Sequence, residues 1–136
     1  MKHTTTFSFE GDQIGLQAAA RNWLAAFVVE MSDDNGFGFL ATDDGREIFV
    51  EGNYSDFFVR NYESKTIDYL SSRPFDGEMH QLSTLEYIPS CSLLDEKNFV
   101  DAVNAFINGR DPAVVDGLVW VRADDIPEEI WEAHLP

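Results

Sequence analysis

Two short segments in the first half of the chain alternate between two faces, as antiparallel strands do. They are 37–42 (FGFLAT) and 46–51 (REIFVE), and the sequence DDG between them is typical of a tight hairpin turn. The pattern therefore predicts a β-hairpin. Because large aromatic side chains are usually buried, we expect the rings of Phe37, Phe39 and Phe49 to face the core.

Further strands are predicted on both sides of this hairpin from their β-branched and aromatic residues. They cover 3–9, 66–72, 79–89 and 117–122. Two other segments have no unique interpretation. The run from Trp23 to Met31 fits either a buried strand or a continued helix, because periodicity does not separate the two over so short a run. The segment 52–65 fits either a bulged loop or a short helix.

The clearest helix is predicted for 95–108, where apolar residues recur at helical spacing. Ser92 and Asp95 resemble a capping box at its start. Gly109 and then Pro112 supply a stop at its end.

Two more helices are expected near the ends of the chain. The first begins with Asp12 as N-cap and continues through QIGLQAAARN. The second is a helix of one or two turns that follows Asp125 as cap, with Ile130 and Trp131 as its apolar anchors. Together these elements predict a single α+β domain over residues 1–136, a curved antiparallel sheet of about five to six strands with one or two helices packed on it.

The charge balance is the most informative total. Asp and Glu number 25 and Lys and Arg number 9, which gives a formal net charge of −16. A domain this acidic repels nucleic acid, because phosphate binding depends on cationic side chains that release counterions. Since a net charge of about 2 to 8 units suffices for solubility, the larger surplus indicates a basic partner.

The composition favours a cytoplasmic protein. One cysteine, Cys91, excludes an internal disulfide framework and fits a reducing compartment. The N-terminal residues show no apolar run typical of a signal peptide, and no segment has the length of a membrane span.

Catalytic and metal-binding patterns are weak. The three histidines, His3, His80 and His134, show no metal-ligand spacing, and the sequence contains no nucleophile elbow, phosphate loop or dinucleotide fingerprint. Cys91 with His80 as base is the one nucleophilic pair to consider, but a lone cysteine is more often a small buried hydrophobe. We therefore expect no enzyme, no cofactor and no metal.

The hairpin segment resembles a cold-shock domain, in which GFGF on one strand precedes IFV on the next. Such domains bind single-stranded RNA with outward aromatic rings surrounded by lysines. Here Asn35 stands where that family carries lysine, and Glu51 where it carries histidine. The charges therefore favour a plain hairpin over an RNA site.

Acidic residues gather at predicted turns and in the C-terminal segment. They predict a negative face that steers a basic partner into contact, with exposed aromatic side chains, among them Phe57, as anchors. The residues expected at this interface are Asp33, Asp34, Asp43, Asp44, Glu47, Glu51, Tyr54, Asp124, Asp125, Glu128, Glu129 and Trp131.

A second resemblance concerns the chain from Ser92 onward. The residues that carry it are Ala102, Phe106, Gly109, Arg110, Pro112, Trp120 and Asp124. In this pattern the segment is similar to the C-terminal half of a bacterial immunity-protein family, of the Imm-one type, found beside polymorphic toxin genes. The resemblance implies a protein that binds a cognate toxin domain, often a nuclease or a nucleic-acid deaminase, and blocks its active site.

Charge and resemblance together predict a cytoplasmic immunity protein that neutralises a basic toxin domain without membrane or nucleic-acid binding. The alternative is another acidic binding module, or a nucleic-acid mimic, with a basic partner. A small enzyme using Cys91 or His80 and a cold-shock-like RNA binder are further alternatives. The sequence leaves the toxin's identity and the oligomeric state open.

Overall fold

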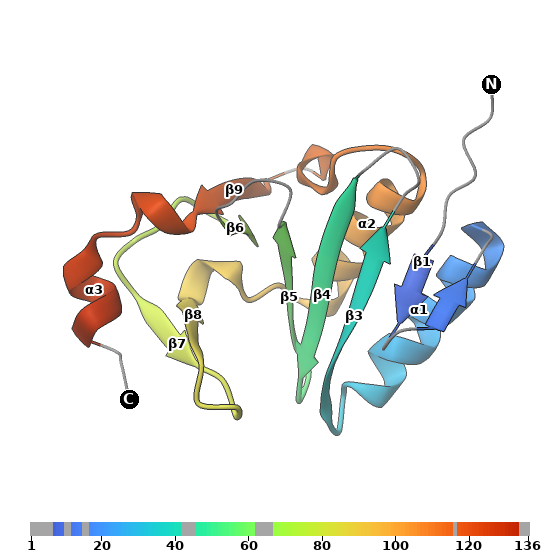
Figure 1. The fold of residues 1–136 in the computed structure, drawn as a ribbon, viewed down its shortest axis with the longest axis horizontal. Coiled ribbons are helices and arrows are strands. Elements are labelled where there is room, and N and C mark those ends of the chain that lie inside the picture. Colours follow the sequence, from blue (N-terminus) through green and yellow to red (C-terminus); the bar gives the residue numbers. More distant parts are fainter. Residues whose placement is uncertain are drawn as a thin grey trace.

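The computed structural model describes residues 7–9, 12–14, 17–41, 46–61, 67–115 and 117–133. Its main feature is a seven-stranded antiparallel sheet in the order β2-β1-β3-β4-β5-β6-β9 (Figure 1). The strands are β1 (Phe7–Phe9), β2 (Asp12–Ile14), β3 (Asn35–Ala41), β4 (Glu47–Asn53), β5 (Asp56–Asn61), β6 (Asp68–Ser71) and β9 (Val119–Arg122).

The remaining elements are a small second sheet and three α-helices. The small sheet pairs β7 (Met79–Gln81) with β8 (Tyr87–Pro89). The helices are α1 (Gln17–Glu30), α2 (Glu96–Ile107) and α3 (Glu128–Ala133). The predicted α+β class is confirmed. Five of the strands, β3 to β6 and β9, form the body of the main sheet, and the two three-residue strands β1 and β2 extend one edge.

The main core lies between one face of the sheet and the helices α1 and α2. Leu40, Ile48 and Val50 of the hairpin are at most 2% exposed on this inner face. Phe99 of α2 stacks on Phe57 of β5 with ring centroids 4.6 Å apart. Phe57 is therefore a core residue, and the expectation that it is an exposed anchor is wrong.

The hairpin rings lie on the opposite, outer face. Phe37 is 47% exposed, and Phe39 and Phe49 are half-buried. The expectation that these rings face the core is wrong. Phe49 alternates with Ile48 and Val50, and α1 and α2 cover the side that carries those two purely aliphatic residues.

The segment from Trp23 to Met31, for which both a buried strand and a continued helix are predicted, belongs to helix α1 apart from Met31. The segment is helical to Glu30, because Leu24, Phe27 and Met31 recur at helical spacing and all three are buried. The start of the helix is predicted wrongly, since β2 occupies Asp12–Ile14 and the helix begins at Gln17.

Helix α2 follows the prediction closely. Asp95 is its N-cap and accepts a hydrogen bond from the backbone N–H of Asn98 at 2.7 Å. Gly109 follows its end with φ of +85°, a left-handed conformation that favours glycine. The expected capping box is wrong, because Ser92 donates its hydroxyl to the carbonyl of Pro89 at 2.7 Å instead.

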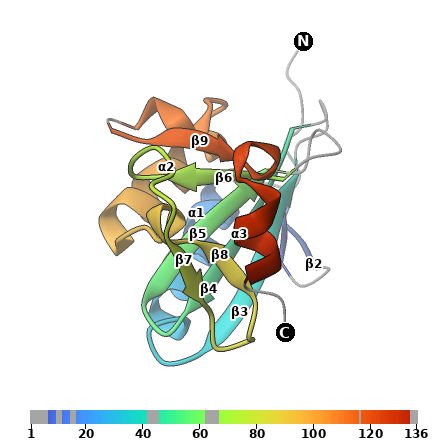
Figure 2. The same ribbon diagram turned by 90° about the vertical axis from the view of Figure 1, so that its left-hand side faces the viewer.

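Elements after β5 cover one part of the outer face. The expectation of a bulged loop or a short helix for 52–65 is wrong, because the segment contains strand β5, and 79–89 forms the two-stranded β7–β8 hairpin instead of one strand. Leu82 and Ile88 from this hairpin bury Phe58 and Tyr69, and Trp131 of α3 packs against the same cluster. In the turned view, α2 lies on one side of the sheet and α3 on the other (Figure 2).

Candidate functional site

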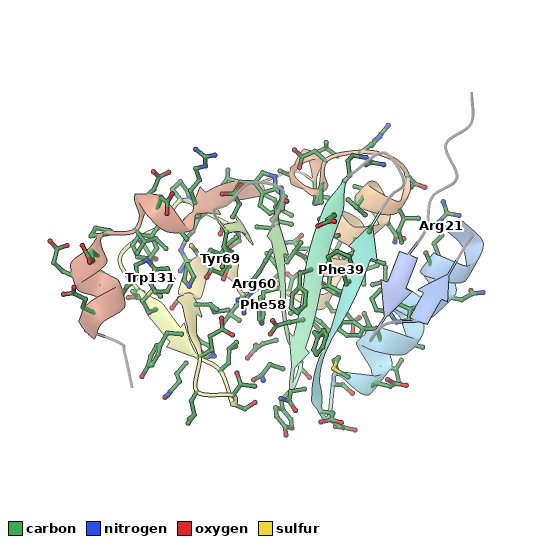
Figure 3. The ribbon with its side chains drawn as sticks, in the orientation of Figure 1. Arg21, Phe39, Phe58, Arg60, Tyr69 and Trp131 are labelled. Atoms are coloured by element: carbon green, nitrogen blue, oxygen red, sulfur yellow. The ribbon has the colours of Figure 1, made fainter. Side chains whose placement is uncertain are left out.

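The outer face of the sheet carries two rows of side chains that the strand register places side by side. One row runs across four strands through Phe39, Phe49, Arg60 and Tyr69. The β7–β8 hairpin and α3 cover its β5 and β6 end, whereas no described element crosses the front of β3 and β4 (Figure 3). Among the described residues, the outer face is thus covered over β5 and β6 and open over β3 and β4.

The second row, Phe37, Glu51 and Phe58, places a ring and a carboxylate on the open half. The rings of Phe37 and Phe49 stack with centroids 5.2 Å apart and planes at 18°. Such offset stacking holds Phe37 in place although nearly half of its surface is exposed.

Arg60 lies at the border between the covered and the open half. It is 5% exposed, and its guanidinium lies 4.8 Å from the ring centroid of Phe58 and 5.7 Å from that of Tyr69. It forms ion pairs with Glu51 at 3.2 Å and with Glu86, from the β7–β8 loop, at 2.6 Å. One buried cation therefore pairs with two carboxylates.

The two carboxylates are unequally compensated. Burial raises the pKa of Glu51 to about 7, because Arg60 lowers it by less and Glu86 raises it further. For Arg60, burial favours a lower pKa, but the hydrogen bond to Glu86 and the charges of Glu51 and Glu86 outweigh it, so the pKa is raised and the guanidinium stays charged. The cluster therefore holds more acid than its one arginine neutralises.

A cleft of about 210 Å³ opens beside this cluster, between the sheet and the β7–β8 loop. The residues that line it are Asn35, Gly36, Phe37, Glu51, Gly52, Asn53, Thr84 and Glu86. Asn53 and Ser83 join the two walls, since the Asn53 amide donates to the Ser83 hydroxyl at 2.6 Å.

Two turns beside the cleft expose apolar side chains in strained backbone. Tyr54 has φ of +50° and is 54% exposed, and Leu85 has φ of +72° and is 66% exposed. Non-glycine residues rarely adopt this conformation, and at Tyr54 the two-residue turn between β4 and β5 requires it, since Ser55 has φ of +76° as well. The backbone N–H of Tyr54 donates to the carbonyl of Asp34 at 2.9 Å, which ties its turn to the acidic turn after α1.

The structure brings part of the expected interface together. Asp33, Asp34 and Tyr54 lie at joined turns, and Glu51 lies in the neighbouring cleft. Glu47, at the other end of β4, lines a separate hollow. Asp43 and Asp44 lie outside the described residues.

The other expected residues lie elsewhere. Asp124, Asp125, Glu128 and Glu129 are exposed at the far end of the molecule, in and before α3 (Figure 1). Trp131 is half-buried, packs against Tyr69 at 6.5 Å and donates its indole N–H to the carbonyl of Ala123. It is an anchor of α3 in the fold. Among the described residues, the acidic side chains expected at the interface therefore lie in separate regions and not on one continuous face.

Several residues of the site differ from the sequence-based expectation. The sequence pattern predicts Phe37 in the core, and it does not point to Arg60, Leu85 or Glu86. Arg60 could have been found from the sequence. In a strand it lies on the same face as Phe58, and a cation next to an aromatic residue on one face is unusual. Glu86 could not have been found in this way, since it reaches Arg60 from 26 residues away in the chain.

Five of the seven residues that carry the resemblance to the immunity family lie together in the fold. Phe106, Gly109, Arg110, Pro112 and Trp120 all line one hollow of about 160 Å³ at the end of α2. The Trp120 indole donates to the side chain of Asp111 at 2.9 Å, and that side chain also caps the turn that begins with Pro112. The pattern thus fixes how α2 ends and β9 begins.

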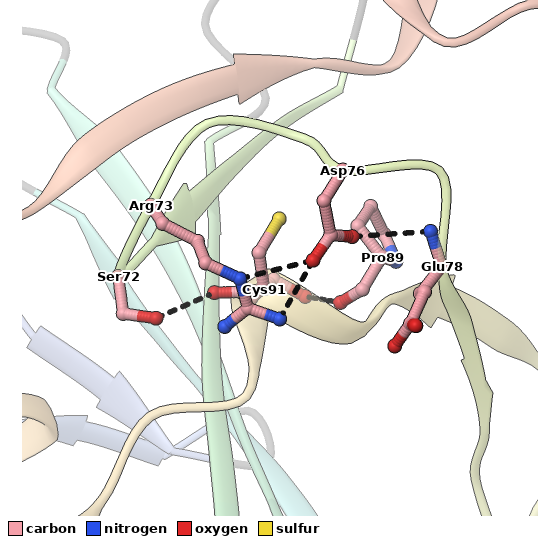
Figure 4. A network of polar contacts seen from close by, with 7 residues as sticks. Ser72, Arg73, Asp76, Glu78, Pro89 and Cys91 are labelled. Atoms are coloured by element: carbon pink, nitrogen blue, oxygen red, sulfur yellow. Dashed lines mark hydrogen bonds and ion pairs between the residues drawn. The ribbon is translucent and has the colours of Figure 1, made fainter.

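The alternative nucleophile is enclosed. Cys91 is 0% exposed and packs against Val121 and Ile126, as expected of a small buried hydrophobe. Its carbonyl accepts a hydrogen bond from Ser72 beside the Arg73–Asp76 ion pair (Figure 4). Among the described residues, no group of three or more His, Cys, Asp and Glu side chains is placed to hold a metal ion.

No helix in the described ranges combines the length and the apolar character that a membrane span requires. Comparison of the chain with protein-family models, curated proteins and solved structures finds no match.

Proposed function

We propose that this chain is a non-enzymatic binding protein that docks a basic protein on the open half of the outer sheet face. The observation that carries the proposal is the placement of Phe37, half exposed, directly opposite Glu51 on the neighbouring strand, next to the turns of Asp34 and Tyr54. Exposed aromatic side chains beside carboxylates are suited to anchor a cationic protein surface.

The more specific form of the proposal is an immunity protein that neutralises a toxin domain. The net charge of −16 supports it, since toxins that act on nucleic acid need a basic surface. The resemblance at Phe106, Gly109, Pro112 and Trp120 supports it from independent residues. In this form the open face covers the toxin's substrate-binding surface in the cytoplasm.

A cold-shock-like RNA binder is the second candidate, because the rings of Phe37 and Phe49 point outward as base stacking requires. The charges oppose it. Glu51 and Glu86 line the adjoining cleft, and Asp33 and Asp34 are exposed next to it, so a phosphate backbone is repelled where it would have to lie.

Coexpression with the product of the adjacent gene tests the proposal, with copurification and rescue of growth as readouts. We expect Phe37→Ala to weaken binding about tenfold or more, because it removes a central anchor. Val114→Ala is the matched control, since Val114 is 53% exposed but lies in the turn after α2, away from the open face.

The proposal is contradicted if Phe37→Ala binds and rescues as well as the unchanged chain. Retention of the chain on single-stranded RNA at physiological salt, lost in Phe37→Ala, would favour the second candidate instead.

A further inference from the structure

The residues that line the cleft beside Phe37 are suited to bind one side chain. Its outer-face wall presents the ring of Phe37 and the carboxylate of Glu51, which are direct cross-strand partners. The β7–β8 loop supplies Thr84 and the carboxylate of Glu86 from the other side. The cleft is thus bounded by one aromatic ring and two carboxylates.

The charge inside this cleft is incompletely balanced. Glu51 and Glu86 share Arg60, and Arg60 contacts both from the covered side of the sheet. The Glu51 side chain is only 19% exposed, so water screens its charge less than it screens that of a surface residue. A second cation that enters from the open side would complete the pairing of the two acids.

Arg60 shows which cation these groups accommodate. Its guanidinium lies over two rings and is paired with the same two carboxylates. A planar guanidinium stacks on aromatic faces and offers five donors, whereas an ammonium is a compact and strongly hydrated charge. The exposed ring of Phe37 repeats, on the open side, the aromatic support that Phe58 gives to Arg60.

We propose that this cleft receives an arginine side chain of the partner protein, with the guanidinium stacked on Phe37 and paired with Glu51 and Glu86. The inference rests on the proposed function for its ligand, since a basic protein supplies such arginines. It adds the position and the chemical class of the central contact.

The chain alone, titrated with L-argininamide and followed by NMR of its backbone amides, tests the site without any partner. We expect saturable shifts that are largest at Gly36, Phe37, Gly52 and Thr84. Lysinamide is expected to bind about tenfold or more weakly, because its strongly hydrated ammonium has no planar face to stack on the ring and cannot form the bidentate pairing of a guanidinium.

Two variants make the result specific. Glu51→Gln keeps the shape of the side chain and should weaken the binding of argininamide about tenfold. Glu86→Gln alters a more exposed carboxylate and should weaken this binding less. Glu128→Gln on α3 is the control and should leave the titration unchanged, and a thermal melt of each variant shows that it is folded.

The inference would be overturned if argininamide and lysinamide caused equal chemical-shift changes that do not saturate and that spread over the exposed carboxylates. Binding that survives Glu51→Gln in a folded chain would overturn it as well. These results leave the proposed function standing if Phe37→Ala still disrupts the complex with the partner. Conversely, saturable argininamide binding supports the site even if the adjacent gene product does not bind.

Discussion

Glu51 affects the stability of the fold and also belongs to the proposed contact surface. Its carboxylate is mostly buried beside Arg60, and its pKa is raised from the ordinary value of 4.5 to about 7. Between these values the folded state binds more protons than the unfolded state. The ionised form of Glu51 is therefore tolerated in the fold at a cost, and a cationic ligand would reduce that cost.

This predicts that the contribution of Glu51 to the free energy of unfolding falls as the pH rises from about 4.5 to about 7, the window between its pKa in the unfolded and in the folded state. Glu51→Gln should lessen that fall by about 1 to 2 kcal/mol, less than the full shift implies because the carboxylate is partly solvated. Urea unfolding of both proteins at the two pH values measures the difference. Parallel pH dependences would show that Glu51 does not titrate as described.

At the scale of elements, the close approach of α1 to the hairpin depends on two small residues. Gly36 and Gly52 are cross-strand partners, and Met31 at the end of α1 packs onto both. A Cβ on Gly52 would lie 2.4 Å from the Cβ of Met31, so an alanine there forces the helix or the strand to move.

Gly52→Ala should therefore lower the free energy of unfolding by about 1 to 3 kcal/mol. Gly36→Ala is the milder comparison, because its Cβ would lie 3.0 Å from the flexible Sδ of Met31. Denaturant midpoints of the two variants test this order. A Gly52→Ala midpoint equal to that of the unchanged chain would contradict the close packing.

The elements themselves were largely predictable from the sequence, and their faces were not. The hairpin strands and helix 95–108 follow from periodicity and turn residues, and the structure confirms them. The alternation in FGFLAT groups Phe37 with Phe39 but does not say which group is buried. The neighbouring strand indicates which face is buried. Phe49 shares its face with Glu47 and Glu51, whereas Ile48 and Val50 share the other, buried face.

Other features depend on long-range contacts that no local pattern contains. Helix α1 begins after Ile14 because 12–14 pairs with β1 as a strand, an interaction that overrides the capping signal of Asp12. Likewise, the cleft exists only because the β7–β8 loop brings Thr84 and Glu86 against β4.

At the scale of the whole molecule, exposed acidic side chains are spread over many of the described elements, and two of the acidic pairs expected at the interface lie in separate regions. Asp33 and Asp34 adjoin the open face, and Glu128 and Glu129 lie on α3, where the half-buried Trp131 serves the fold. Both pairs are exposed and carry the same charge. A general attraction of a basic partner would depend on them equally, whereas docking on the open face depends on the first pair.

The most direct test is the affinity of the basic partner for two doubly substituted chains, Asp33→Lys with Asp34→Lys and Glu128→Lys with Glu129→Lys. Both change the net charge by the same amount. We predict a loss of about tenfold or more for the first chain and less than about threefold for the second, measured by titration calorimetry. Equal losses, or a greater loss for the α3 pair, would contradict docking on the open sheet face.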